Sequence, residues 1–505
     1  MTVLLRRRKK RSRERGVALI LVLGALTILT VMLTDFQDET SAELGSALSA
    51  RDGLKAEYAA RSAVSLSRLL ISAEPTIRKA IAPLFMLMGG PPPQIPVWQF
   101  ADQVLGAFND TAGQAKFSAL ASVNMEKGKK LGMEGAGFDI EILDEDSKID
   151  LNNAWRDPLT QTRLAAQIMG LISPLQYEPL FTSRDGDGQY SDRMQICGAM
   201  IDWADANQDM TTCDMRSALG PSSAPEDSFY QMLDPPYFRK NAPFDSLEEL
   251  HNVRGISDDF WSTFIDPDPN DASRRNVTVW GTGKVNVNTA NAQTLLAVVC
   301  GGATAAKMCI DPLEGAKFVA LVNMIRMFTM GAPVFSSANG FINTLKQQSP
   351  IGLILKSLNL EPVIFSSEAE VKKAITAESK VFTIIATGRV KSGQRDSRVR
   401  INAVVDFRSA PTPAQLLANV LPPGAAAALG LGGAPGTGAA GSPGTGIGGG
   451  LGGLGLTGDA TNALPYTGFQ PGQLPANAPP GATVDGALAY LMPNPGGRIV
   501  YFHMD

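Results

Sequence analysis

The chain has 505 residues, a formal net charge of −4 and 44% hydrophobic residues. This length exceeds that of a typical single domain, so we expect at least two folded units, and the ordinary apolar fraction excludes a wholly disordered or collagen-like chain. Residues 1–16 carry a net charge of +7, which leaves −11 on residues 17–505. Such an acidic body argues against a general nucleic-acid-binding protein, which needs a basic surface to displace counterions.

The basic N-terminal run is followed directly by an apolar run. Gly16 separates the two, and residues 17–34 (VALILVLGALTILTVMLT) carry no charge. A helix of this length spans about 27 Å, close to the thickness of a bilayer core. The basic flank predicts a single-pass anchor with the residues after it outside the cytoplasm. An uncleaved anchor and a secretory signal peptide are alternatives, although no A-x-A site follows the apolar run.

The junction between Gly16 and Val17 resembles the class III leader of type IV pilins and pseudopilins, which a prepilin peptidase cuts after the glycine. The resemblance implies cleavage between these two residues and N-methylation of Val17. Most members of the family carry Glu at the fifth mature position, where this chain has Leu21. In the family that Glu is thought to pair with the terminal amine of a neighbouring subunit. A subunit without it suits the tip of the filament, as in the K-type minor pseudopilins of type II secretion.

One helix is expected over residues 17–74. Residues 35–73 contain no Pro and carry apolar residues at helical intervals, and Pro75 is expected to end the helix. The first half would lie in lipid, and the second half would pack on a globular domain.

Strand-like runs flank a long region of helical character. The clearest of them alternates apolar and polar residues, as a half-buried antiparallel strand does, and the last two are joined by a polar turn. These runs are residues 116–123, 137–144, 381–390 and 397–407.

The expected fold class is therefore α+β, with a pilin-like antiparallel sheet interrupted by a large α-helical insertion. A Gly/Ala/Pro-rich tail follows the sheet, and its composition predicts flexibility, with a terminal strand around residues 496–503 as a further expectation. The expected units are a leader (1–16), the helix (17–74), the first part of the pilin-like domain (75–152), the insertion (153–375), the final strands (376–410) and the tail (411–505).

This order again resembles the K-type minor pseudopilin, whose sheet is interrupted by a helical domain. Short motifs of that family recur in order, namely D-W-A-D at 202–205, A-P-E-D-S-F-Y at 224–230, N-A-P-F at 241–244 with L-E-E-L at 247–250, and V-N-V-N-T-A at 285–290. At the second motif this chain has Ala-Pro where the family has Gly-Ala.

The resemblance implies a subunit that caps the tip of the pseudopilus, initiates its assembly and supports protein export across the outer membrane. The implied partners are the I-type and J-type minor pseudopilins in a tip complex, the major pseudopilin and the prepilin peptidase. The implied location is the inner membrane of a Gram-negative bacterium, with the globular part in the periplasm. A type IV pilus tip minor pilin is the nearest alternative.

Two segments, around residues 248–256 and 285–299, look like pieces of helix-hairpin-helix modules, which bind the DNA backbone through hairpin amides. They lack surrounding Lys and Arg, so we favour packing helices in a protein-interaction domain and expect no nucleic-acid partner. A membrane-anchored periplasmic interaction protein is therefore a second alternative. No P-loop, G-x-S-x-G, H-E-x-x-H or Rossmann fingerprint occurs, so we expect no enzyme.

An acidic loop over residues 202–209 (DWADANQD) places oxygen side chains at spaced positions that can converge on one hard cation. An EF-hand is excluded, because the twelfth position from Asp205 is Arg216 rather than Glu. The K-type family binds calcium in its helical domain, and this supports a calcium site here; the alternative is a solvated surface loop. The candidate ligands are Asp202, Asp205, Asn207 and Asp209, with Glu226 and Asp227 as further candidates.

The cysteines form two pairs, 16 and 9 residues apart, that do not fit the CxxC spacing of a zinc or redox site. Outside the cytoplasm we expect two local disulfides, while four buried free thiols are the alternative. A further acidic cluster at residues 144–146 is interpreted as turn chemistry at a strand end. The candidate disulfide residues are Cys197 with Cys213 and Cys300 with Cys309.

Overall fold

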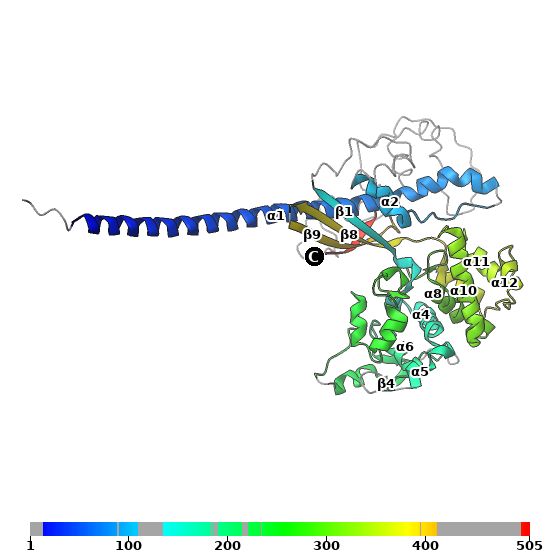
Figure 1. Cartoon of the computed structure of the whole chain (residues 1–505). Coiled ribbons are helices and arrows are strands. Elements are labelled where there is room, and N and C mark those ends of the chain that lie inside the picture. The colour runs from blue at the N-terminus through cyan, green and yellow to red at the C-terminus, as the bar shows by residue number, and fades with distance from the viewer. Residues whose placement is uncertain are drawn as a thin grey trace, which may run out of the picture.

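Three parts make up the molecule: a long helix, an antiparallel sheet and a helical domain (Figure 1). The structure is a computed structural model, and it describes residues 14–87, 90–109, 135–182, 184, 190–214, 221–233, 235–393, 395–411 and 496–505. Most of the expected leader, the expected strand at 116–123 and the tail from 412 to 495 lie outside these described residues.

Helix α1 runs from Glu14 to Leu87. Its N-terminal half extends away from the rest of the molecule (Figure 1), and the large apolar side chains there are exposed. Among the described residues it is the one helix long and apolar enough to cross a membrane. The structure therefore provides a single candidate anchor at the position that the sequence predicts.

The expected end of this helix at Pro75 is wrong, because α1 continues through it to Leu87. Proline removes one backbone donor and crowds the preceding turn, which normally ends a helix. Contacts made by neighbouring side chains offset this cost. Glu74 is buried and lies 3.3 Å from Arg78 Nε, and Arg78 also pairs with Glu378 just before the sheet. The contact with Glu378 is 300 residues distant in sequence, so the local pattern could not reveal it.

Within the described residues the sheet has four strands, and each pairs antiparallel with its neighbour. The helical domain is inserted between two strands that lie side by side, and the last strand comes from the C-terminal end of the chain. In spatial order the strands are β1 Ala136–Asp144, β8 Val381–Ser392, β9 Arg395–Asp406 and β10 Arg498–Met504.

One face of the sheet is covered by the second half of α1 (Figure 1). The buried positions of the helix are mostly small, including Ala56, Ala60 and Ala63, and this lets the helix lie close to the strands. Gly388 on β8 sits at the closest approach, where an added Cβ would collide with the carbonyl oxygen of Ala56. Short elements between α1 and β1 are η1 Val97–Phe100, α2 Ala101–Leu105 and η2 Gly106–Phe108.

The close approach at Gly388 gives a testable prediction. Gly388→Ala is expected to lower the free energy of unfolding by about 1–3 kcal/mol, because the helix must move off the sheet. Chemical denaturation of the purified chain measures this value. Gly53→Ala is the matched control: Gly53 lies in α1 with no atom near its Cβ position, so Ala there should be neutral or stabilising. Equal stability of the two variants would contradict the packing described.

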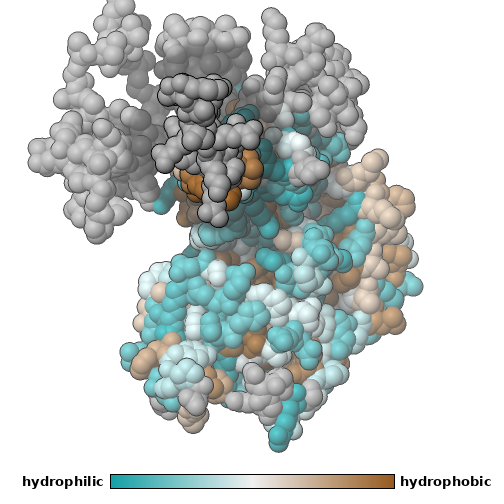
Figure 2. All heavy atoms as spheres, turned by 60° about the vertical axis from the view of Figure 1, so that its left-hand side comes forward, coloured by the Kyte–Doolittle hydropathy of each residue, from teal (hydrophilic) through white to brown (hydrophobic). Residues whose placement is uncertain are grey.

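The helical domain has its own hydrophobic core. The face seen in Figure 2 is mostly hydrophilic, with hydrophobic residues gathered along one side. Its helices are α4 Pro158–Ile172, α5 Glu178–Thr182, α6 Arg193–Asp202, α7 Asp258–Phe260, α8 Ala292–Gly302, α9 Lys307–Ile310, α10 Pro312–Thr329, α11 Ala338–Leu345, α12 Gly352–Ser357 and α13 Glu368–Ala374.

Short strand pairs and single turns connect these helices. The pairs are β2 Ile149–Asp150 with β5 Val277–Thr278, β3 Asp209–Thr211 with β4 Pro221–Pro225, and β6 Val285–Asn286 with β7 Ile375–Thr376. The turns are η4 Glu145–Ser147, η5 Leu151–Trp155, η6 Leu175–Tyr177, η7 Glu226–Ser228, η8 Tyr230–Met232, η9 Leu247–Asn252, η10 Trp261–Ile265 and η11 Ala272–Arg274.

The terminal strand β10 belongs to the same sheet and pairs with β9 at its edge. It also contacts the other two parts of the molecule. Arg68 of α1 donates to the carbonyl oxygens of Gly496 and Gly497 at 2.7 and 2.8 Å. The ring of Tyr501 lies 5.4 Å from that of Trp280 in the helical domain. The end of the chain thus joins helix, sheet and insertion.

Candidate functional site

The segment that joins the sheet to the helical domain, residues 144–150, is called the joint below. The sequence predicts turn chemistry for the acidic residues 144–146, and in the structure all three are buried, as is Asp150. Asp144 does shape the turn, since it accepts from the backbone N–H of Asp146 at 3.0 Å. It also accepts from the hydroxyls of Ser379 and Thr289, both at 2.5 Å. The turn is therefore also a polar contact between the start of β8 and the helical domain.

Asp146 makes the same connection through backbone groups. Its side chain has no exposed surface. One carboxylate oxygen accepts from the N–H groups of Lys380 and Val381 at 2.6 and 3.1 Å, and the other accepts from the N–H of Thr282 at 2.8 Å. Three backbone donors from two parts of the molecule thus depend on one carboxylate.

Glu145 extends the network on the other side of the joint. It accepts from the hydroxyls of Thr278 in the insertion and Thr383 on β8, at 2.5 and 2.6 Å. Lys148 Nζ lies 3.2 Å from its carboxylate, and both side chains are buried. A buried network in which every member is paired restricts motion, so the joint holds the helical domain in one orientation on the sheet.

Three carboxyl groups of the joint, those of Asp144, Asp146 and Asp150, have raised pKa values, and burial is the first cause in each. Burial, with the nearby Asp146 charge as a second cause, raises the pKa of Asp144 to about 7. Burial raises the pKa of Asp150 to about 7 as well, although Arg156, 3.3 Å away, opposes the rise. A carboxyl with a raised folded-state pKa binds its proton more tightly in the folded chain than in the unfolded chain.

This predicts a stability that falls with pH. Between about pH 4 and pH 7 the folded chain binds more protons at these groups than the unfolded chain does, so their contribution to stability is full below about pH 4 and is lost as the pH rises through about 7. We expect the melting temperature to be higher at pH 5.5 than at pH 8. Carboxyls with lowered pKa values, such as Glu368 at about 2, change charge below this window. Asp144→Asn should make the melting temperature depend less on pH. A wild-type melting temperature that rises from pH 5.5 to 8 would contradict the prediction.

The acidic loop at residues 202–209 connects α6 to β3. The candidate calcium ligands in and near it do not all point to one common position. Asp202 is buried and accepts from the N–H of Thr211 at 2.9 Å. Asp205 is buried beside Asn207, whose amide nitrogen donates to it at 2.6 Å. Asp209 is exposed, and its backbone N–H donates to the side-chain oxygen of Asn207. The side chain of Glu226 lies outside the described part of the chain.

A basic residue that the sequence did not single out packs against this loop. Arg239 is buried, and its guanidinium donates to the carbonyl oxygens of Asp202 and Asn207 at 3.2 and 2.9 Å. Its Nε lies 3.4 Å from the carboxylate of Asp227. Nothing local in the sequence marks Arg239 as a partner, since it lies more than 30 residues beyond the loop.

Burial also controls the protonation of the loop. It raises the pKa of Asp202 to about 7 and that of Asp205 to about 6, while Arg239 acts in the opposite direction. Within the described residues, no three acidic, His or Cys side chains are grouped so that they could hold one ion. Among the described carboxylate oxygens of this loop, Asp205 Oδ1 is buried without a hydrogen-bond partner, and this one feature favours a bound ion. As arranged, these residues do not fit calcium, which stays an untested prediction.

Both cysteine pairs form disulfides in the structure. Cys197 and Cys213 have Cα atoms 6.0 Å apart, and Cys300 and Cys309 have Cα atoms 5.5 Å apart. The first bridge links α6 to the residue just after β3 and so encloses the acidic loop. This is the local pairing that the sequence predicts for an oxidising compartment.

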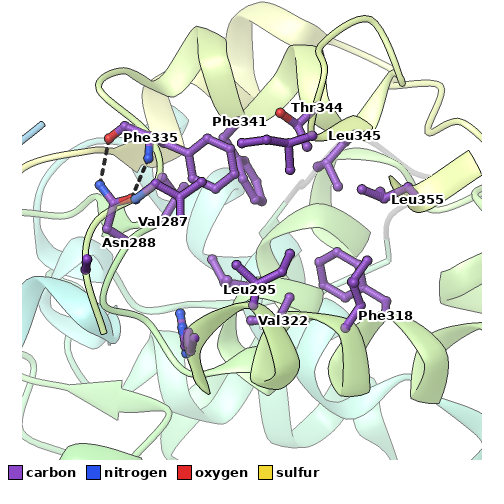
Figure 3. A pocket seen from close by; sticks show the side chains of 16 residues that line it. Val287, Asn288, Leu295, Phe318, Val322, Phe335, Phe341, Thr344, Leu345 and Leu355 are labelled. Carbon is purple, nitrogen blue, oxygen red and sulfur yellow. Dashed lines mark hydrogen bonds between the residues drawn. The ribbon is translucent and has the colours of Figure 1, made fainter. Parts of the chain in front are cut away.

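An apolar pocket lies among the helices α8, α10, α11 and α12 (Figure 3). Phe318, Phe335 and Phe341 line it, and Asn288 fixes one wall by hydrogen bonds of 2.8 and 2.9 Å to the backbone of Phe335. Its volume is about 60 Å³, far below that of ordinary ligand sites. We interpret it as a gap in core packing.

The hairpin-like segment at 248–256 packs inward. Gly255 has φ +82°, and an added Cβ would lie 2.6 Å from Ile196 of α6 and 3.0 Å from Ser191. Its turn therefore rests against the core of the domain. This favours the interpretation of these segments as packing elements.

Comparisons with known proteins find similarity among solved structures. No protein-family model and no curated protein matches the chain. A chain of the crystal structure titled GspK-GspI-GspJ complex from enterotoxigenic Escherichia coli Type 2 Secretion System is similar, with 14% sequence identity and a TM-score of 0.30. The match covers 54% of this chain and 76% of that chain.

Proposed function

We propose that this chain is a K-type minor pseudopilin that caps the tip of the type II secretion pseudopilus, initiates its assembly and supports export across the outer membrane. The observation that carries the proposal is the insertion of a whole helical domain between two neighbouring strands of a sheet that packs on a long N-terminal helix. The leader junction at Gly16–Val17 and the missing Glu at Leu21 support it from the sequence.

The geometry suits a cap. Since β1 and β8 are adjacent, both connections to the helical domain leave the same end of the sheet, at Asp144 and Val381. That end lies away from the apolar half of α1 (Figure 1). The joint holds the domain there rigidly. A second subunit stacked above, with its helix parallel to α1, would collide with this bulk.

The resemblance to K-type minor pseudopilins supports the proposed processing, location and partners of the chain. The prepilin peptidase removes residues 1–16 and Val17 is methylated, after which the apolar half of α1 anchors the subunit in the inner membrane of a Gram-negative bacterium. The globular part lies in the periplasm, where its disulfides would form. Its partners are the I-type and J-type minor pseudopilins at the tip and the major pseudopilin below.

A deletion strain tests this proposal. Loss of the chain should leave normally exported proteins in the periplasm, because assembly of the pseudopilus does not start, while type IV pili and twitching stay intact. The full chain supplied from a plasmid should restore export. Loss of pili with export unchanged would instead identify a type IV pilus tip subunit, and a strain with both processes intact would contradict both assignments.

A further inference from the structure

The acidic loop is closed in two ways by the chain itself. The disulfide between Cys197 and Cys213 joins the residues that flank it. Inside, Asp202 and Asp205 are almost fully buried. Buried carboxylates are costly unless a cation or several donors accompany them, so the loop needs a positive charge close by.

Arg239 supplies that charge from outside the loop. Its guanidinium reaches the carbonyl oxygens at both ends of the turn, those of Asp202 and Asn207. Backbone carbonyls of this kind are also what a calcium ion takes from a loop. The carboxylate of Asp227, 3.4 Å away, lies on the same guanidinium. Arg239 thus contacts three residues from the candidate calcium-ligand set.

The guanidinium is well suited to this place. It is planar, stays charged at every ordinary pH and offers five donors in a fixed arrangement. A divalent ion added among the same carbonyls would lie within a few Å of it and be repelled. Arg239 therefore supplies a positive charge at the carbonyl oxygens that a metal ion would use.

We propose that Arg239 is the permanent cation of the loop at residues 202–209, so that the helical domain of this chain folds without calcium. The side chain comes from the segment after η8 and is buried against the end of α6 and the loop that follows it. The inference concerns the loop alone and does not depend on the proposed role at the pseudopilus tip.

Thermal unfolding of the full chain in detergent, followed by tryptophan fluorescence, tests this directly. The wild-type melting temperature should agree within about 1 °C in EDTA and in millimolar calcium chloride. Arg239→Met keeps the apolar stem and removes the charge, so it should lower the melting temperature by about 5–10 °C. Arg274→Met is the matched control, because Arg274 forms an exposed pair with Asp268 and its loss should shift the value by about 2 °C at most.

Two results would overturn the proposal. The first is a wild-type chain that melts several degrees higher in calcium than in EDTA, with saturable calcium binding that Asp205→Asn abolishes. The second is an Arg239→Met chain as stable as the Arg274→Met control. The wild-type comparison is decisive by itself if Arg239→Met does not fold.

Discussion

Asp146→Ala is expected to lower the free energy of unfolding by about 3–5 kcal/mol, because it leaves three backbone N–H groups, one buried and two partly buried, without their acceptor. These groups belong to Lys380 and Val381 at the start of β8 and to Thr282 in the helical domain. The substitution removes bonds from both sides of the joint at once. Denaturant titration measures the loss, and limited proteolysis should show new cleavage at residues 144–150.

Two variants isolate the cause. Asp146→Asn keeps one acceptor oxygen and should retain part of the stability. Asp139→Ala on β1 is the control, since that carboxylate is exposed and pairs with Arg389 at the surface; its loss should cost less than about 1 kcal/mol. If Asp146→Ala were no less stable than Asp139→Ala, the joint would not be what fixes the helical domain.

Removal of the first disulfide is expected to have the next largest effect. Replacing both Cys197 and Cys213 by Ala frees a 16-residue span, and the chain-entropy argument gives a loss of about 3 kcal/mol. The partner pair Cys300 and Cys309 closes a span of 9 residues, so its removal should cost slightly less. Melting temperatures of the two double variants make the comparison.

Reduction of the wild-type chain provides a control for the two double variants. Adding a reductant to the wild-type chain should reproduce the combined loss, while each double variant should respond to the reductant only through its remaining bridge. Four alkylatable thiols in the chain isolated from the periplasm would mean that neither bridge forms in the cell.

The local sequence pattern predicted those elements that short-range interactions determine. The alternation in residues 137–144 and the polar turn after residue 390 predicted β1 and the β8–β9 hairpin, because period-2 burial and turn chemistry act over a few residues. The apolar run and its basic flank predicted the exposed half of α1 for the same reason.

Long-range contacts account for what the pattern could not predict. The continuation of α1 past Pro75 depends on Arg78 meeting Glu378. The burial of Asp144 and Asp146 depends on donors that lie 136 to 235 residues further along the chain. Arg239 reaches a loop more than 30 residues before it. Charge spacing predicted a calcium site at residues 202–209, which stays an untested prediction, and it could not show that Arg239 packs against this loop.

The mature N-terminus tests the central claim most directly. Intact mass and N-terminal sequencing of the chain purified from membranes should show a protein that begins at N-methylated Val17. Gly16→Leu should block this cleavage, whereas Leu21→Ala, four residues past the junction, should leave it unchanged. A strain without the prepilin peptidase should keep the full chain. A wild-type chain that retains Met1, or that is cut after the apolar run, would contradict the assignment as a pseudopilin.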